Sequence, residues 1–348
     1  MSHKINLITM RMSNHAHASG YDRLTDYLNA RVIYNDSNWT IGKRIFCRAF
    51  KFLIKRSDSV WYHRDSFINE FFAASEWFRH KRQIFHFLYG ENSHRYLGVL
   101  KSVGPRNFIV CTYHTPPEKF CEVVQNHKHL SCLDAIIVVS TVQSEYFSEL
   151  VGSERVFYVP HGIDVEYFKP MADHRRHDNV VHALFVGSML RDFETLVQAA
   201  RLLNSWTNNF RVSVVTPTQH HHYFQGMDNI ELYSGISDEK LLHLYQTSDI
   251  FLLPLLDGTA NNSLLEAMAC GLPIVTTDLP GVRDYVNDAC ALLAPQFNPK
   301  ALAERILYLK ENEIVRQKMA IESRRHSLDF SWQKVASKTS EVYQRICA

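Results

Sequence analysis

The chain has 348 residues, of which 46% are hydrophobic and 21% charged, and its formal net charge at pH 7 is +2. This length exceeds the size at which one hydrophobic core stops growing, so we expect two domains. The composition is ordinary for a globular protein and excludes a largely disordered chain. So small a net charge argues against a nucleic-acid-binding protein, which needs a strongly basic domain or stripe.

The seven cysteines are scattered and include no C-x-x-C pair, so neither a disulfide framework nor a zinc site is indicated. The first ten residues, MSHKINLITM, hold too short an apolar run before Arg11 for a secretory signal. No run approaches the roughly 18 apolar residues of a membrane-spanning helix. We therefore expect a soluble protein of the cytoplasm.

Short apolar runs rich in β-branched residues recur, each followed by a stretch of helical character, which is typical of parallel strands joined by helices. Strands of such a sheet are buried on both faces and should be almost continuously apolar. Four runs in the first half satisfy this, at 5–9, 108–114, 135–140 and 156–160. Four in the second half repeat it, at 182–187, 211–216, 249–256 and 272–277.

A stretch rich in proline and polar residues begins at Pro160 and separates the two halves. This composition is typical of interdomain linkers, so we place the linker near 160–170. The sequence thus predicts an α/β protein of two doubly wound domains facing a cleft, at 1–160 and 161–330. Ligands of such domains bind beyond the carboxyl ends of the strands.

The most informative segment is DIFLLPLLDGTANNSLLEAMACGLPIVTTDLPGVRDYV at 249–286. Its strand is expected to end at Leu256, and a helix is expected to start near Asn262 or Ser263, which are both good N-cap residues. The backbone N–H groups at such a start form a ready anion site. Two roles are open for Glu266: capping the helix from the capping-box position, or accepting hydrogen bonds from the ribose hydroxyls of a nucleotide.

This segment resembles the donor-binding element of the retaining GT-B glycosyltransferases of the group 1 type (family 4-like), in which L-L-E-A-M-A-C-G-L-P follows a proline-ended strand and an acidic-Gly loop. Three further segments are similar to the family in order and spacing, at 156–170, 234–254 and 330–346. The last looks like the family's closing helix, which implies that 331–348 returns to the first domain.

The resemblance implies a GT-B fold of two Rossmann-like domains, with the donor held by the second and the acceptor by the first. It implies transfer of a sugar from a UDP- or GDP-sugar to a glycan, lipid-linked or other acceptor with retention of configuration. No metal and no cofactor is expected. Two other functions stay open, a degenerate binding or scaffold protein and an epimerase or phosphorylase of the same fold.

Within the donor loop the resemblance assigns nucleotide-sugar binding to seven residues, Asp257, Gly258, Asn261, Asn262, Ser263, Leu264 and Glu266. The family usually carries E-x7-E, and counting back from Glu266 places the first acid at Gly258. Asp257 supplies an acid one position earlier. Either the loop is one residue longer here, or Asp257 substitutes from a shifted backbone.

A second candidate segment is FVGSMLRDFETL at 185–196. Gly187 permits close backbone approach, and Arg191 is a cation suited to the donor diphosphate. Ser188 stands where the family has arginine, and Arg191 resembles a replacement for the family's lysine. The alternative is that Arg191 is a helix-surface residue paired with Glu194.

In the first domain, His114 follows a predicted strand and resembles a family histidine that contacts the donor sugar, although a structural role is the alternative. Gly20 resembles the glycine of the first strand–helix loop, which approaches the diphosphate. With these, the catalytic candidates are His114, Arg191 and Glu266. The HHH run at 220–222 lacks a second cluster and is interpreted as a solvated loop, not a metal site.

The stretch IGKRIFCRAFKFLIKR at 41–56 places Arg44, Arg48, Lys51 and Lys55 on one face of a single helix. One interpretation is a surface helix whose apolar side enters the core. The other is peripheral contact with anionic membrane at its inner face, which would suit an acceptor carried on a lipid.

Overall fold

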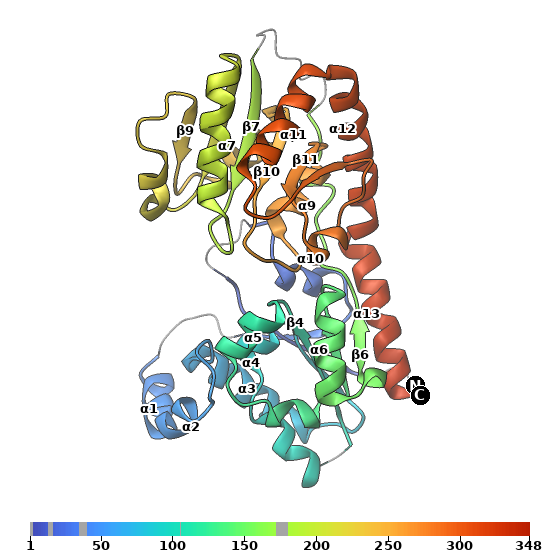
Figure 1. Cartoon of the computed structure of the whole chain (residues 1–348). Helices are drawn as coiled ribbons and strands as arrows, with labels where there is room; N and C mark the ends of the chain where they lie inside the picture. The colour runs from blue at the N-terminus through green and yellow to red at the C-terminus, as the bar shows by residue number, and fades with distance from the viewer. Residues whose placement is uncertain (1–2, 13–16, 35–39, 105, 172–179) are drawn as a thin grey trace. The chain divides into compact units, whose positions relative to one another are not determined.

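The computed structural model describes residues 3–12, 17–34, 40–104, 106–171 and 180–348. These form two compact units (Figure 1). Unit 1 comprises Met1–His15, Gly20–His161 and Trp332–Ala348, and unit 2 comprises Ala16–Ser19 and Gly162–Ser331. Each unit holds one six-stranded sheet. Two six-stranded parallel sheets covered by helices are the α/β, Rossmann-like architecture of the GT-B fold, as the sequence predicts.

The sheet of unit 1 has the strand order β2-β1-β3-β4-β5-β6, and every neighbouring pair is parallel. Its strands are β1 (Ile5–Ile8), β2 (Arg31–Ile33), β3 (Ile84–Phe87), β4 (Phe108–Tyr113), β5 (Ala135–Val138) and β6 (Val156–Tyr158). The four predicted strands are confirmed, whereas β2 and β3 were not predicted. In β3 the apolar run is interrupted by His86, which is buried between Tyr343 Oη at 2.6 Å and Thr112 Oγ1 at 2.7 Å.

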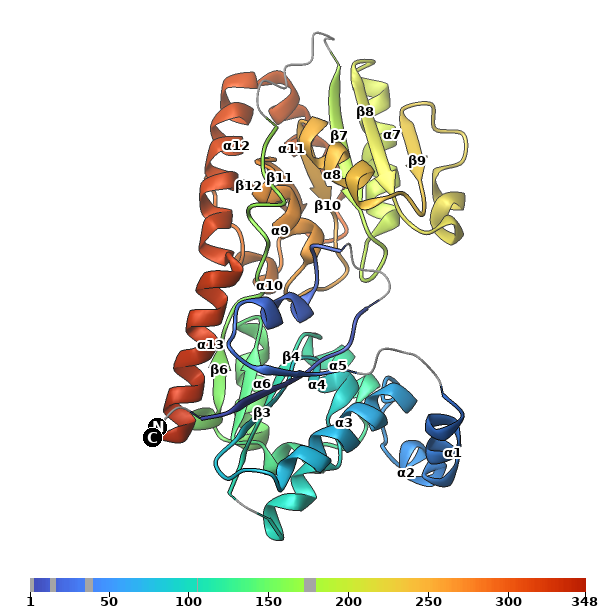
Figure 2. The same ribbon diagram turned by 180° about the vertical axis from the view of Figure 1, so that it is seen from behind.

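Helices cover both faces of this sheet (Figures 1 and 2). The α-helices of unit 1 are α1 (Ile41–Ala49), α2 (Lys51–Lys55), α3 (Arg64–Trp77), α4 (Gly90–Ser93), α5 (Pro117–Val123), α6 (Val142–Val151) and α13 (Trp332–Cys347). Its 3-10 turns are η1 (Tyr21–Asp26), η2 (Leu97–Ser102), η3 (Lys128–Cys132) and η4 (Ser153–Arg155).

The single helix predicted over 41–56 is wrong, because α1 and α2 are separate. Phe50 lies between them with φ −99° and ψ 16°, outside helical geometry. Its ring packs against Phe46 at 4.8 Å and Phe67 at 5.7 Å, and we attribute the break to this packing.

The sheet of unit 2 has the order β12-β11-β10-β7-β8-β9 and is also parallel throughout. Its strands are β7 (Val181–Val186), β8 (Phe210–Val215), β9 (Ile230–Tyr233), β10 (Ile250–Leu253), β11 (Ile274–Thr277) and β12 (Ala291–Ala294). The four predicted strands are confirmed, and β9 and β12 were not predicted. β10 ends at Leu253 and not at Leu256, since Pro254 has no N–H to continue the ladder.

Unit 2 has six α-helices and two 3-10 turns within its described residues (Figure 2). They are α7 (Phe193–Trp206), η5 (Thr218–Phe224), α8 (Asp238–Thr247), α9 (Asn262–Ala269), α10 (Pro280–Arg283), α11 (Pro299–Glu311), α12 (Glu313–Ser327) and η6 (Leu328–Phe330). In the part of the chain that the structure describes, no helix has both the length and the apolar character needed to cross a membrane.

The strand order of each sheet reverses once, between β1 and β3 in unit 1 and between β7 and β10 in unit 2. At such a reversal the loops leave the sheet in opposite directions, and ligands of this architecture bind in the crevice that results. Both reversals therefore mark the place where functional residues should be sought within each unit.

Candidate functional site

The reversal in unit 2 is built around Gly187, which directly follows β7 and has a φ of +106°. A Cβ at this position would lie 2.6 Å from Arg191 Nη2. Glycine is therefore required for two reasons: it adopts this positive φ without strain, and its lack of a Cβ leaves space for the Arg191 guanidinium. It allows the guanidinium of Arg191 to fold back over the end of the strand.

Arg191 is held there by several hydrogen bonds. Its Nε donates to Val186 O at 3.1 Å, and its Nη2 donates to Asn261 Oδ1 at 3.3 Å and to Ser263 Oγ at 3.0 Å. Burial lowers the pKa of Arg191 to about 10, so the group still carries its charge at neutral pH. The guanidinium thus lies beside the residues that open α9.

The alternative of a helix-surface arginine paired with Glu194 does not fit the hydrogen bonds of Arg191. Helix α7 begins at Phe193, and its N-cap is Asp192, whose carboxylate accepts from Thr195 N at 2.9 Å. Arg191 precedes this cap and is therefore not part of the helix. Within the described residues it forms no ion pair with Glu194.

Helix α9 begins at Asn262, and its N-cap is Asn261, one residue earlier than the sequence suggests. The Asn261 side chain accepts from Leu264 N at 3.3 Å and from Ser263 Oγ at 2.8 Å. The first N–H groups of an α-helix have no partner within the helix, and they carry partial positive charge. Together with the Arg191 guanidinium they form a positively polarised surface suited to an anion.

The carboxylate of Glu266 binds partners outside α9, and the N-cap of this helix is Asn261. The Glu266 side chain is buried, and its two carboxylate oxygens accept hydrogen bonds from Ser19 Oγ and from Tyr245 Oη, the latter at 2.7 Å. Burial raises the pKa of Glu266, and the hydrogen bonds from Ser19 and Tyr245 oppose that rise. Neither partner is predictable from the sequence, because Ser19 is 247 positions away and Tyr245 belongs to a different helix, α8.

The donor loop runs close to the loop that opens α10. Asp257 is half-buried, and its Oδ1 accepts from Gly258 N at 2.7 Å. A Cβ added at Gly281 would lie 2.1 Å from Gly258 O, so the two backbones touch. This close approach fixes the turn that carries Asp257.

In unit 1, His114 directly follows β4 and is half-buried, with a neighbour that the sequence did not reveal. Its backbone N–H and that of Thr115, the latter at 2.9 Å, donate to Glu91 Oε1, and its Nδ1 lies 3.6 Å from Glu91 Oε2. Burial raises the pKa of Glu91, but the hydrogen bonds and the charge of His114 outweigh it and bring the pKa below its ordinary value. Glu91 lies on α4, so it joins the loops that follow two adjacent strands.

Gly20 lies at the other side of the same reversal, with a φ of +104° at the start of η1. The next residue, Tyr21, has its ring 4.8 Å from the ring of His114, edge to face. Tyr89 Oη accepts from the backbone N–H of Tyr21 at 2.9 Å. The loops after β1, β3 and β4 therefore gather Gly20, Glu91 and His114 at one edge of the sheet.

The HHH run forms part of the turn η5, where the sequence predicted a solvated loop. His221 Nε2 donates to Thr216 O at 3.2 Å, and the ring of His220 stacks on Phe193 at 4.6 Å. No group of three side chains able to hold a metal ion occurs among the residues that the structure describes. These histidines are structural.

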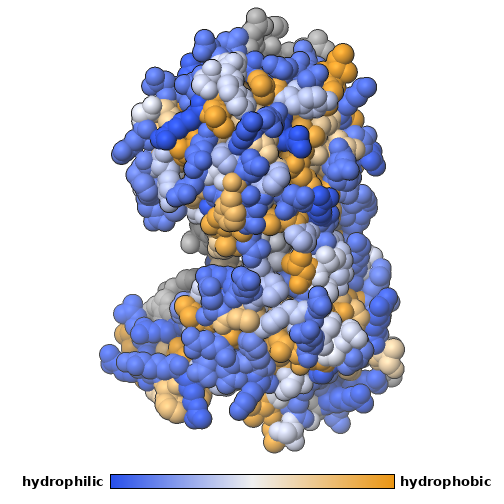
Figure 3. Space-filling view, viewed as in Figure 1, coloured by the Kyte–Doolittle hydropathy of each residue, from blue (hydrophilic) through white to orange (hydrophobic). Residues whose placement is uncertain are grey.

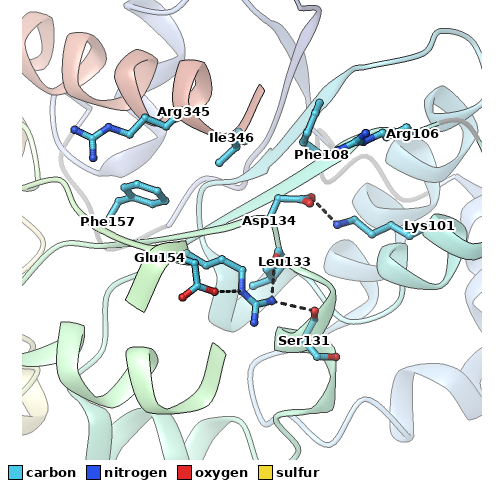
Figure 4. Close-up of a pocket in the computed structure, with 11 residues that line it drawn as sticks. Lys101, Arg106, Phe108, Ser131, Leu133, Asp134, Glu154, Phe157, Arg345 and Ile346 are labelled. Carbon is cyan, nitrogen blue, oxygen red and sulfur yellow. Dashed lines mark hydrogen bonds and ion pairs between the residues drawn. The ribbon is translucent and has the colours of Figure 1, made fainter. Parts of the chain in front are cut away.

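A cavity of about 490 Å³ lies at the opposite edge of the unit 1 sheet, where β4, β5 and β6 begin (Figure 4). Two of its cations are paired with acids, Lys101 with Asp134 at 2.6 Å and Arg155 with Glu154 at 3.5 Å. It lies far along the strands from His114 and takes no part in the candidate site.

Comparison with known proteins finds a match to a protein family in unit 2. Residues 181–312 match the family model described as "Glycosyl transferases group 1". This match covers the strands of unit 2 and supports the resemblance to group 1 glycosyltransferases. The matched range contains Gly187, Arg191, the start of α9 and Glu266.

Among curated relatives, this chain is 25% identical over 226 residues to an MMP alpha-(1->4)-mannosyltransferase of Mycolicibacterium hassiacum, a match that covers 62% of this chain and 54% of that protein. The chain spans about half the length of the curated relatives it matches.

Solved structures show the same fold at low identity. Sucrose-phosphate synthase of Thermosynechococcus elongatus has a TM-score of 0.70 at 17% identity, and the match covers 99% of this chain and 98% of the synthase chain. Anabaena Alr3699/HepE, solved with UDP and glucose, has a TM-score of 0.69 at 14% identity and covers 98% of this chain and 99% of its own. The chain therefore has the GT-B fold.

Proposed function

We propose that this chain transfers a sugar from a nucleotide-sugar, a UDP- or GDP-sugar, to a hydroxyl of a glycan or lipid-linked acceptor. The observation that carries the proposal is the convergence of Arg191, Gly187 and the start of α9 at the reversal of the unit 2 sheet. A half-buried guanidinium beside a helix start suits a diphosphate, the leaving group of such a donor.

In the proposed reaction the bond between the sugar C1 and the leaving phosphate oxygen breaks while the acceptor oxygen bonds to C1 on the same face. The acceptor proton passes to the departing phosphate, so the anomeric configuration is retained. Charge grows on the diphosphate as it leaves, and the Arg191 guanidinium and the N–H groups of Asn262 and Ser263 would stabilise it, whereas the Leu264 N–H is bonded to the Asn261 side chain. These groups supply the positive charge, so the scheme uses no metal ion.

Glu266 is proposed to hold the ribose. A carboxylate has about four lone-pair sites, and Ser19 and Tyr245 occupy two of them, so two remain for ribose hydroxyls. The two protein hydrogen bonds fix the orientation of the carboxylate before the nucleotide binds. Asp257 is proposed to face the donor sugar from its turn after β10.

In unit 1, His114 is proposed to contact the donor sugar and Gly20 the diphosphate. Glu91 then acts as a positioning residue, because its carboxylate holds the backbone of the His114 loop and faces the imidazole. The acceptor side of the reaction is assigned to this unit. We further propose that the protein works in the cytoplasm and meets the inner face of the membrane peripherally through residues 41–56.

The test is nucleoside diphosphate release by the purified chain with a panel of UDP-, GDP- and ADP-sugars and candidate acceptors. We expect one donor to be consumed, EDTA to leave the rate unchanged, and the anomeric coupling constant of the product to equal that of the donor. An inverted product would contradict the same-face reaction, and a rate abolished by EDTA would contradict the metal-free scheme.

A binding or scaffold role is the second candidate. It is favoured by Gly258 and Ser188, which stand where the family usually has an acid and an arginine. Slow hydrolysis of the donor without an acceptor distinguishes the two functions, since a degenerate site binds the nucleotide but does not cleave it.

A further inference from the structure

The helices α1 and α2 of unit 1 expose large apolar side chains that a folded protein normally covers. Ile41 is 77% exposed, Ile45 63% and Phe52 66%. Ile41 and Ile45 are four residues apart and share one face of α1. One of the two interpretations of residues 41–56 was a surface helix whose apolar side enters the core. The exposure of these three side chains shows that they are not part of the core.

The same helices carry a dense positive charge. Residues 41–56 contain six basic side chains and no acidic one, namely Lys43, Arg44, Arg48, Lys51, Lys55 and Arg56. All of these except Lys43, which is half-buried, are exposed. In Figure 3 the region of α1 and α2 shows apolar patches set among hydrophilic surface.

The two helices are nevertheless anchored to unit 1. Phe46 packs against Phe71 of α3 at 4.6 Å and against Phe67 at 5.8 Å, and Tyr96 Oη donates to Leu53 O at 2.5 Å. Their outer face is thus presented by a fixed support. Phe71 and Phe72 of α3 are themselves partly exposed and extend the apolar surface beyond the two helices.

Charge selects the partner that would cover this surface. A second copy of the chain would bring six positive charges against six others, which repel. Nucleic acid would pair with the cations but would leave the aliphatic side chains exposed to water. An anionic bilayer satisfies both, since lipid phosphates bind cations and the acyl boundary buries apolar side chains.

We propose that α1 and α2 form a membrane-insertion element, in which Ile41, Ile45 and Phe52 enter an anionic bilayer below its head groups. Arg44, Arg48, Lys51 and Lys55 bind the lipid phosphates at its surface. This goes beyond electrostatic contact, because two separable forces hold the protein. Salt weakens the charge contribution and leaves the insertion in place.

The direct test measures binding of the full chain to vesicles of phosphatidylcholine with and without phosphatidylglycerol, by sedimentation and without any donor. Each cation near an anionic surface contributes roughly fivefold in affinity. Each inserted side chain contributes on the order of tenfold. We expect Ile41→Ser/Ile45→Ser/Phe52→Ser to weaken binding about 1,000-fold at low salt, although every positive charge remains.

A matched control is Ile314→Ser/Ile321→Ser on α12, where two equally exposed isoleucines, at 71% and 68%, lie far from the basic helices along the chain. This control should bind vesicles as the wild type does. The variant Arg44→Gln/Arg48→Gln/Lys51→Gln/Lys55→Gln should lose the preference for phosphatidylglycerol and the dependence on salt.

Depth is measured with Phe52→Trp and brominated acyl chains. We expect a blue-shifted emission that the bromine quenches when vesicles are anionic. Serine variants that bind as tightly as the wild type, or a tryptophan that no brominated lipid quenches, would overturn the proposal. The proposal would also be overturned if light scattering showed that the wild type is a dimer and the serine variant a monomer. Because no sugar is transferred in these experiments, their failure leaves the proposed reaction untouched.

Discussion

Replacing Gly187 by alanine displaces Arg191 without removing it. The backbone there has a φ of +106°, which only glycine adopts freely, so alanine adds strain of about 1–3 kcal/mol. The new Cβ would lie 2.6 Å from Arg191 Nη2, the far end of a flexible side chain. The guanidinium therefore moves, and it loses its hydrogen bonds to Ser263 at 3.0 Å and Asn261 at 3.3 Å.

The catalytic loss follows from the same displacement. A hydrogen bond to a charged group is worth about 1.5–3 kcal/mol, and one such bond to the leaving diphosphate is lost. Since each 1.36 kcal/mol is a factor of ten in rate, kcat/KM should fall about 10- to 150-fold. The assay is the initial rate of nucleoside diphosphate release with saturating acceptor.

Gly226→Ala is the matched control for backbone strain. Gly226 also has a positive φ, +73°, and nothing lies within 4 Å of its added Cβ. Both variants should lose stability to chemical denaturation, but only Gly187→Ala should lose rate. Equal rates in the two folded variants would refute the role given to Arg191.

Three further predictions concern side chains that the structure places around the site and the core. Glu91→Gln should lower kcat about tenfold with little loss of stability, because Gln still accepts the two backbone N–H groups but carries no charge towards His114; a wild-type rate would show that His114 needs no carboxylate. Tyr245→Phe removes one hydrogen bond to Glu266 and should weaken binding of the nucleotide by about 0.5–1.5 kcal/mol in calorimetry. Unchanged affinity would show that Tyr245 does not contribute to nucleotide binding. Glu76→Gln removes the charge that pairs with Lys4, Arg31 and Arg79 and should lower the free energy of unfolding at pH 7 by about 1–2 kcal/mol. The loss is no larger because these three cations are well exposed and screened by solvent. Burial raises the pKa of Glu76, but the three cations outweigh burial and lower the pKa from 4.5. In urea titrations the difference in the free energy of unfolding between wild type and variant should therefore be complete above about pH 4.5 and vanish as the pH falls through the lowered pKa. A difference in unfolding free energy that persists at low pH would contradict the ionic cause.

The parallel strands were predictable because burial on both faces leaves an unbroken apolar run, as in β4 and β10. The run fails in β3, where the fold buries His86 by giving each ring nitrogen a hydroxyl partner. Local rules also misplaced the N-cap of α9, since Ser263 and Asn261 are both good caps and the contact of Asn261 with Arg191 is not local.

The residues that surround the candidates were beyond a reading of the sequence. Glu91 touches His114 because two loops end at the same edge of a sheet, and the sequence does not state which strands are adjacent. Ser19 reaches Glu266 across 247 positions. The basic stripe at 41–56 was visible as charge, but whether its apolar neighbours are covered depends on their packing against α3. Their exposure supports the proposed contact with a membrane.

Unit 2 is proposed to bind a nucleotide-sugar through Glu266 and Arg191. Calorimetric titration of UDP-, GDP- and ADP-sugars into the wild type and into Glu266→Gln tests it most directly, with circular dichroism to confirm that both are folded. We expect one nucleotide-sugar to bind the wild type, and the variant to bind it about 1–3 kcal/mol more weakly, because a ribose hydroxyl loses its charged acceptor. Equal affinity in the two folded proteins, or no binding of any nucleotide-sugar to the wild type, would contradict the account.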